Sequence, residues 1–255
     1  MYYCYGISDK GVMPHNEDAL MMSDFVLTHG SGECSIKPPF ILAVADGVSG
    51  ECAGELASAM CLSMVKEIND FRRDSLENSI MEIHERLAEF GRNDSESRNM
   101  QTTLCGISVD TGGVITSFNA GDSRLYRFHD GCLEQITRDQ SLVQLLYEEG
   151  KITPEERRTH ARRNIIFPVI GNIKDSPMVE IRDVPEITEN GDILMLCTDG
   201  LSDYLSDDEI KEILERSGSL HEKLDILMET ALKNGSKDNI SIILVSPEQR
   251  EEITL

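Results

Sequence analysis

Short apolar runs of strand length alternate with two blocks of helical periodicity, and this order constrains the fold most strongly. The clearest runs read FILAVA at 40–45, ILMLC at 193–197 and ISIILV at 240–245. They have the length of buried strands and fall well short of the roughly 18 apolar residues that a membrane span needs. Apolar residues spaced three and four apart predict helices over 51–71 and 75–90.

The other expected elements follow from alternation, turn residues and Pro154. Strands are predicted at 2–8, 25–28, 103–109, 114–120, 123–128, 132–136 and 178–184, helical structure within 139–163, and helices at 207–216 and 220–233. This order predicts an α+β fold in which helices cover antiparallel sheets. Without a repeat or linker, residues 1–255 are expected to form one domain, with a loose tail at 246–255.

Composition excludes some partners and indicates a compartment. The 46 acidic and 24 basic residues give a net charge of -22, which disfavours nucleic acid and anionic membranes as partners. The N-terminus has no basic patch followed by an apolar stretch, so no secretion signal is expected. Seven cysteines without a CxxC pair are typical of reduced core thiols, which predicts a cytoplasmic protein.

Five acidic groups lie beside glycine or directly next to strands. In chain order they are Asn16-Glu17-Asp18, Asp46-Gly47, Gly121-Asp122, Asp199-Gly200 and Asp238-Asn239. Taken singly, an Asp-Gly pair is usually a turn, and the first group could be a helix cap. Together, carboxylates fixed at strand ends would repel one another unless cations lie between them. Their hard oxygens favour magnesium, manganese or calcium over zinc.

These motifs resemble the metal-dependent protein phosphatase family, the protein phosphatase 2C type, in its compact bacterial form. The matching segments are 16–18, 44–50, 53–55, 102–104, 120–124, 137–141, 164–171, 198–203 and 237–241. The resemblance extends from residue 1 to about residue 246, in order and at ordinary spacings. It implies a four-layer α-β-β-α sandwich of two antiparallel sheets flanked by helices.

The resemblance also implies two core metals, Mn²⁺ or Mg²⁺, and the residues that bind them. Asp46 would bridge both ions, Asp199 and Asp238 would complete one site, and the Gly47 carbonyl would serve the other. Glu17 and Asp18 would act mostly through water. Asp122 would form a third, weaker site with Asp199.

The implied activity is metal-dependent hydrolysis of phosphoserine and phosphothreonine in proteins, opposing a bacterial serine/threonine kinase. A water bridging the two metals would attack phosphorus in line, without a cysteine nucleophile. His15, Arg162 and Arg163 are candidates for substrate contact, the two arginines in the segment that corresponds to the family's mobile flap. Each could equally be a solvated loop residue.

One departure leaves a second function open. Met13 stands where the family usually carries a phosphate-binding arginine, so a charge-assisted contact worth about 1.5–3 kcal/mol is expected to be missing. A catalytically weak or inactive domain that binds a partner is therefore the alternative. The complete set of aspartates weighs against it, and the lack of histidine ligands weighs against an unrelated metal phosphoesterase.

Overall fold

Two six-stranded antiparallel sheets stack face to face in the computed structural model, which describes residues 1–48, 53–188 and 191–248. The order is β4-β1-β12-β11-β8-β9 in the first sheet and β10-β7-β6-β5-β2-β3 in the second. The strands are β1 (Tyr2–Asp9), β2 (Asp18–Met22), β3 (Phe25–Leu27), β4 (Gly30–Ile36), β5 (Phe40–Asp46), β6 (Leu104–Val109), β7 (Ile115–Ala120), β8 (Arg124–His129), β9 (Cys132–Gln135), β10 (Glu180–Val184), β11 (Ile193–Cys197) and β12 (Ile240–Pro247).

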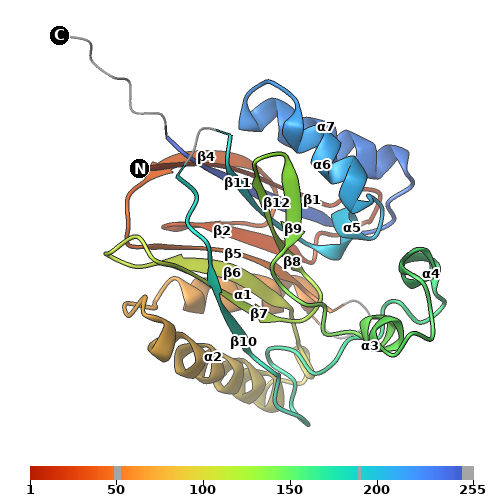
Figure 1. Ribbon diagram of the computed structural model, residues 1–255. Coiled ribbons are helices and arrows are strands. Elements are labelled where there is room, and N and C mark those ends of the chain that lie inside the picture. Colours follow the sequence, from red (N-terminus) through yellow and green to blue (C-terminus); the bar gives the residue numbers. More distant parts are fainter. Residues whose placement is uncertain (49–52, 189–190, 249–255) are drawn as a thin grey trace.

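Helices cover both outer faces, so the predicted four-layer sandwich is confirmed (Figure 1). They are α1 (Gly54–Val65), α2 (Arg73–Asn93), α3 (Leu142–Glu148), α4 (Pro154–Thr159), α5 (Asp199–Ser202), α6 (Asp207–Glu215) and α7 (Leu220–Lys233). α1 and α2 pack under the second sheet, and α5, α6 and α7 pack on the first. α3 and α4 project to one side of the sandwich in Figure 1.

Three apolar layers hold the sandwich together. One lies between the sheets and includes Leu42, Leu196 and Ile243, each fully buried. The other two lie between each sheet and its helices. Because strand side chains alternate between faces, every central strand must be apolar on both. This explains why the runs at 40–45 and 193–197 are entirely apolar and why the run at 240–245 has a single polar residue, the buried Ser241.

The strand register brings the acidic motifs to one end of the sandwich. Asp18 begins β2 and lies opposite Asp46 at the end of β5. In the first sheet, β11 ends next to the start of β12, since Cys197 pairs with Ile242. Asp199 follows β11 and Asp238 precedes β12, so the two residues lie at neighbouring strand ends although they are far apart in sequence.

Several predicted bounds differ from the structure. β2 and β4 were not expected: β2 is a short buried run, and β4 is an edge strand rich in glycine and serine. α1 ends at Val65, earlier than predicted, and the expected helix start at 51–52 lies outside the described residues. α2 begins at Arg73 and continues to Asn93, so it extends beyond both predicted bounds of 75–90.

The segment 139–163 contains two short helices, and Pro154 opens the second as predicted. Thr153 and Glu156 close a reciprocal capping box at that start. β12 extends to Pro247, so residues 246 and 247 belong to a strand and not to the predicted loose tail, of which residues 249–255 lie outside the described part.

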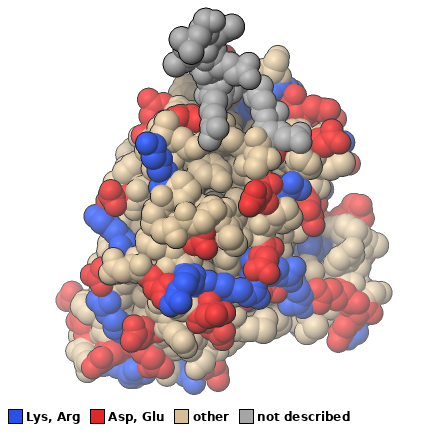
Figure 2. Space-filling model, turned by 60° about the vertical axis from the view of Figure 1, so that its left-hand side comes forward, with Lys and Arg blue, Asp and Glu red and all other residues tan. Residues whose placement is uncertain are grey.

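The surface mixes both signs of charge. On the face shown in Figure 2, acidic and basic side chains alternate without separating into regions of one sign. In the described residues, no helix is long and apolar enough to cross a membrane.

A buried ion pair braces the strand that follows Asp122. Arg124 Nε and Nη2 donate to the two carboxylate oxygens of Asp139 at 2.9 and 2.7 Å, and both residues are 4% exposed. Arg124 Nη1 also donates to the Tyr126 hydroxyl, and the Gln135 amide donates to Asp139 Oδ1. Each guanidinium nitrogen and each carboxylate oxygen of the pair therefore has a hydrogen-bond partner, which offsets the cost of burying two charges.

Removing one partner of this pair should be costly. Asp139→Asn leaves the Arg124 charge buried without its counter-ion, so the free energy of unfolding should fall by about 3–5 kcal/mol in urea titrations. Asp70→Asn is the matched control, because the Asp70–Arg72 pair is also bidentate but exposed. Equal losses in the two variants would contradict a bracing role for the buried pair.

Candidate active site

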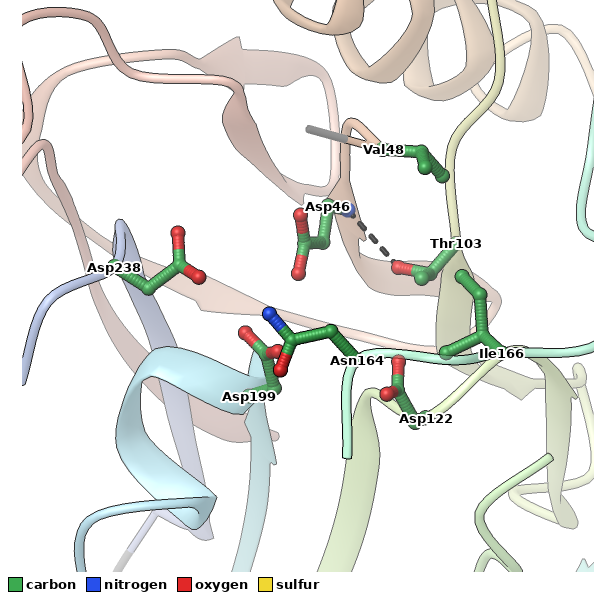
Figure 3. Close-up of a pocket in the computed structure, with 8 residues that line it drawn as sticks. All are labelled: Asp46, Val48, Thr103, Asp122, Asn164, Ile166, Asp199 and Asp238. Carbon is green, nitrogen blue, oxygen red and sulfur yellow. Dashed lines mark hydrogen bonds between the residues drawn. The ribbon is translucent and has the colours of Figure 1, made fainter. Parts of the chain in front are cut away.

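A small cleft opens where the acidic strand ends meet (Figure 3). Its lining residues come from both sheets and from the segment after α4: Asp46, Val48, Thr103, Asp122, Asn164, Ile166, Asp199 and Asp238. In Figure 3 the carboxylates of the four aspartates face a shared space, with the Asn164 amide among them. The structure thus brings together four of the acidic groups that the sequence singled out.

Backbone hydrogen bonds fix Asp46 at the end of β5. Its amide donates to Thr103 Oγ1 at 3.0 Å, and its carbonyl accepts from the Thr103 amide and from Thr102 Oγ1. The Thr103 hydroxyl also bonds to that of Ser123, next to Asp122. These contacts connect the Asp46 backbone to Thr103 and, through the Thr103 hydroxyl, to Ser123 beside Asp122. The backbones that carry Asp46 and Asp122 are therefore fixed relative to each other.

Gly47 continues this rigid turn. Its amide donates to the Glu17 carbonyl at 3.0 Å. A Cβ at this position would lie 2.3 Å from the Gly54 carbonyl oxygen, so only glycine fits where the turn meets the start of α1.

Asp199 is held where α5 crosses the start of β12. A Cβ on Gly200 would lie 1.9 Å from the Asn239 carbonyl oxygen, so this approach also requires glycine. The Thr198 amide donates to the Ser241 carbonyl at 3.1 Å, which aligns the two strand ends. Asp199 Oδ1 is buried without a hydrogen-bond partner in the structure. A buried carboxylate oxygen in that condition is suited to a cation.

Asp18 and Glu17 lie behind the cleft lining. Asp18 is 1% exposed, and Thr198 Oγ1 donates to its Oδ2 at 2.7 Å. Asn239 Oδ1 accepts from the Glu17 amide, and its Nδ2 donates to the His15 carbonyl. Hydrogen bonds of the Asn239 side chain therefore connect the last acidic motif, at the start of β12 in the first sheet, to the first acidic motif, at the start of β2 in the second.

Burial is the main cause of the raised pKa values of these aspartates, and repulsion from neighbouring carboxylates adds to it. Burial, followed by Asp18, Asp199, Asp238 and Asp122, raises the pKa of Asp46 well above its usual range. Asp199 has a raised pKa for the same reasons, with burial again the main cause. Burial also raises the pKa of Asp18 and of Asp122 to about 7. The metal-free cleft therefore favours protonated carboxyls.

This chemistry fits divalent cations with hard oxygen ligands. The donor set is purely carboxylate, amide and backbone oxygen, as Mg²⁺ and Mn²⁺ prefer. Among the described residues, no three histidine, cysteine, aspartate or glutamate side chains close on one point to hold an ion by themselves. Mg²⁺ commonly retains several water ligands, so it does not require three protein side chains at one point.

The predicted substrate-contact residues lie outside the cleft lining. His15 is exposed, and Arg162 is exposed on the loop after α4. Arg163 Nε lies 3.3 Å from Asp203 Oδ2, and Arg163 lines a neighbouring hollow between α4 and the segment that follows α5. Met13 is half-buried, and its amide donates to the Lys10 carbonyl in a turn.

Sequence reasoning missed three residues that shape the site. Asn164 reaches the cleft from the loop next to Arg163; it begins the matching segment 164–171, but that match gave it no role. Thr103 fixes Asp46 through its hydroxyl, and Asp203 anchors Arg163. The second aspartate of the 198–203 motif was the available signal for Asp203.

The family of the chain follows from this fold and site. The family model described as protein phosphatase 2C matches residues 15–244, so the chain belongs to that family. Stp1 of Staphylococcus aureus, a serine/threonine phosphatase, superposes with a TM-score of 0.82 at 33% identity, covering 98% of this chain and 96% of that one.

Two further similarities concern the phosphatase PstP. The Mycobacterium tuberculosis serine/threonine protein phosphatase PstP is 33% identical over 209 residues, or 80% of this chain. The chain spans only 40% of the length of that relative. A catalytic domain of PstP solved with two manganese ions superposes with a TM-score of 0.76 at 30% identity, covering 96% of this chain and 99% of that one.

The raised pKa of Asp122 predicts a pH dependence of stability in chelator. A carboxyl whose pKa is about 7 when folded and about 4 when unfolded stabilises the fold at low pH, and this contribution is lost as pH rises from about 4 to 7. The Asp122→Asn variant lacks this titration. The melting temperature of the natural protein minus that of the variant should therefore fall by roughly 10 °C over that range.

Asp130→Asn provides the control for this measurement. Asp130 is exposed in the turn at the opposite end of β8 and has a positive φ of 48°, which asparagine tolerates. Its melting difference from the natural protein should stay flat with pH. A flat difference for Asp122→Asn as well would show that this carboxyl is not kept protonated by the cleft.

Proposed function

We propose that this protein hydrolyses phosphoserine and phosphothreonine in proteins, using two Mn²⁺ or Mg²⁺ ions held in the aspartate cleft. The observation that carries the proposal is the convergence of four aspartates from separate strand ends on one cleft. Family membership and the two manganese ions of the PstP domain support it.

The proposed metal ligands follow from position in the cleft. Asp46, at the centre of the acidic group, would contact both ions. Asp199 and Asp238, from adjacent ends of the first sheet, would complete one site, and the Gly47 carbonyl would serve the other. Glu17 and Asp18 lie further back and would bind metal-bound water. Asp122 and Asp199 would form a third, weaker site.

The protein's own groups orient the reaction. When bound, the cations activate a water nucleophile and neutralise charge on the phosphoryl oxygens. The carboxylates hold their positions because Thr103, Thr198 and Gly200 fix the backbone or the oxygens around them. The cysteines remain outside the mechanism: Cys105 and Cys197 are buried, and burial raises the pKa of Cys197 to about 12.

Substrate contact is assigned to the rim of the cleft. Arg163 is best placed, because Asn164, the next residue, lines the cleft. Its pairing with Asp203 holds the guanidinium beside α5, where a phosphoprotein would approach. Arg162 and His15 are exposed and stay candidates for a more distant contact.

The proposal also covers the substrates, the cellular location and the domain organisation. The proposed substrates are targets of a bacterial serine/threonine kinase, or the kinase itself, since the similar proteins are bacterial serine/threonine phosphatases. We place the reaction in the cytoplasm, because the six described cysteines are free. Residues 1–255 are proposed to act as one catalytic domain.

Loss of either central aspartate should abolish turnover and leave the fold intact. Asp46→Asn and Asp199→Asn remove a charged ligand with almost no change in shape, so manganese-dependent hydrolysis of a phosphothreonine peptide should fall at least a hundredfold, roughly 2.7 kcal/mol. Calorimetry should show weakened manganese binding, and Mn²⁺ should no longer raise the melting temperature.

Asp130→Asn should match the natural protein in all three measurements, because Asp130 lies at the far end of β8. If both site variants keep tight manganese binding, the assignment of ligands is wrong. A natural protein that binds manganese and phosphopeptide without turnover would instead support the alternative, a phosphatase-like binding module.

Met13→Arg tests how the chain compensates for the missing phosphate-binding arginine. A guanidinium near the cleft would add a charge-assisted contact, so kcat/KM for small phosphate esters should rise about tenfold for each 1.4 kcal/mol gained. The same substitution in an Arg163→Gln background shows whether Arg163 already supplies the contact. If it does, the gain in kcat/KM from Met13→Arg should be larger in that background than in the natural protein. A decrease on both esters and peptides would show that position 13 does not face the phosphate.

A further inference from the structure

Two cysteines lie directly opposite each other across neighbouring strands. In the antiparallel register of β1 and β4, Cys4 is paired with Cys34. Both side chains point toward the apolar layer between the sheets, where Cys4 is fully buried and Cys34 is half-buried. They lie at the edge of the first sheet, since β4 is its outermost strand.

This placement satisfies the geometric requirement for a disulfide. Residues directly opposite in an antiparallel pair have Cα atoms about 4.5 or 5.5 Å apart, depending on the hydrogen-bonding position. Disulfides span Cα separations of about 4.4–6.8 Å, so either position is suitable. Their side chains lie close enough to interact, since a hydrogen bond between them is the main cause of the pKa shift of each thiol.

The two thiols differ in reactivity. The hydrogen bond from Cys4 lowers the pKa of the Cys34 thiol, although partial burial and Asp24 act in the opposite direction. The same bond and burial raise the pKa of Cys4 well above its usual range. Cys34 is therefore the thiol that reaches solvent and ionises first, and Cys4 is the buried partner behind it.

We infer that Cys4 and Cys34 form a redox site, in which hydrogen peroxide converts the pair to a reversible disulfide. The Cys34 thiolate attacks a peroxide oxygen, the O–O bond breaks, and Cys34 becomes a sulfenic acid as one water is released. The Cys4 sulfur then attacks the Cys34 sulfur and expels hydroxide, which takes the Cys4 proton and leaves as the second water. Both sulfurs are oxidised by one electron each, and the peroxide is reduced to two waters.

The site is separate from the metal cleft and acts on a different part of the fold. Cys4 lies four residues before Ser8, whose hydroxyl accepts from the Asn16 amide at 2.9 Å. At about 3.3 Å per strand residue, the pair is more than 10 Å from that end of the sandwich. The crosslink closes the loop of about 30 residues that carries the first acidic motif, so it should stabilise the fold without blocking the cleft.

Peptide mapping of the peroxide-treated protein tests this inference. The reduced full-length chain is exposed to peroxide, free thiols are alkylated in denaturant, and the digest is analysed without reductant. The expected product is a Cys4–Cys34 linked peptide that disappears after dithiothreitol. Formation of this disulfide in the intact protein should raise the melting temperature of the protein by about 5 °C or more.

Two variants and one internal control sharpen the result. Cys4→Ser should leave Cys34 as a sulfenic acid that dimedone traps, whereas Cys34→Ser should leave Cys4 reduced. Cys132, which is exposed on β9, reports oxidation of a solvent-accessible thiol away from the pair. The inference is overturned if Cys34 oxidises in the natural protein without linking to Cys4, if only Cys132 reacts, or if the linked form melts no higher than the reduced form.

Discussion

Repulsion among carboxylates at one end of the sandwich is the constraint on which the rest of the site depends. Four aspartates face one cleft, and Asp18 lies directly behind them. Holding like charges together costs free energy, which the fold offsets with its apolar layers and with rigid backbone contacts around each aspartate. The surrounding threonines and glycines prevent the side chains from swinging apart to relieve the repulsion. A cleft kept in this condition is prepared for cations and is poorly stabilised without them.

The central architecture could be predicted from sequence because burial on both faces leaves a clear pattern. The runs at 40–45, 193–197 and 240–245 are strands β5, β11 and β12 with nearly the expected bounds. The edge strand β4 could not be predicted in the same way, because it is buried on one face and carries Gly30 and Gly32. The start of β2 was hidden for another reason, since Asp18 is a charged residue that is nonetheless buried.

The acidic part of the site was predictable, and the rim was not. Aspartates at strand ends have their position fixed by the strand, so Asp46, Asp122, Asp199 and Asp238 could be placed together before the structure was known. Loop residues have no repeating backbone geometry that fixes the direction of their side chains. Arg163 turns toward Asp203 and Asn164 turns into the cleft, a choice that depends on tertiary contacts with α5 rather than on local pattern. The family resemblance supplied the region but not the orientation of its side chains.

The position of β12 has a consequence for how the molecule is made. Among the described residues, β12 follows all the other strands in sequence, yet it lies in the middle of the first sheet, between β1 and β11. While the ribosome is still synthesising the segment before residue 238, β1 has no partner on its inner side and the cleft lacks Asp238. The nascent chain must therefore keep β1 and β11 apart from other exposed strand edges until β12 inserts between them. Completion of the sheet and completion of the acidic site are the same late event, so a chain that stops short of β12 loses its fold and its chemistry together.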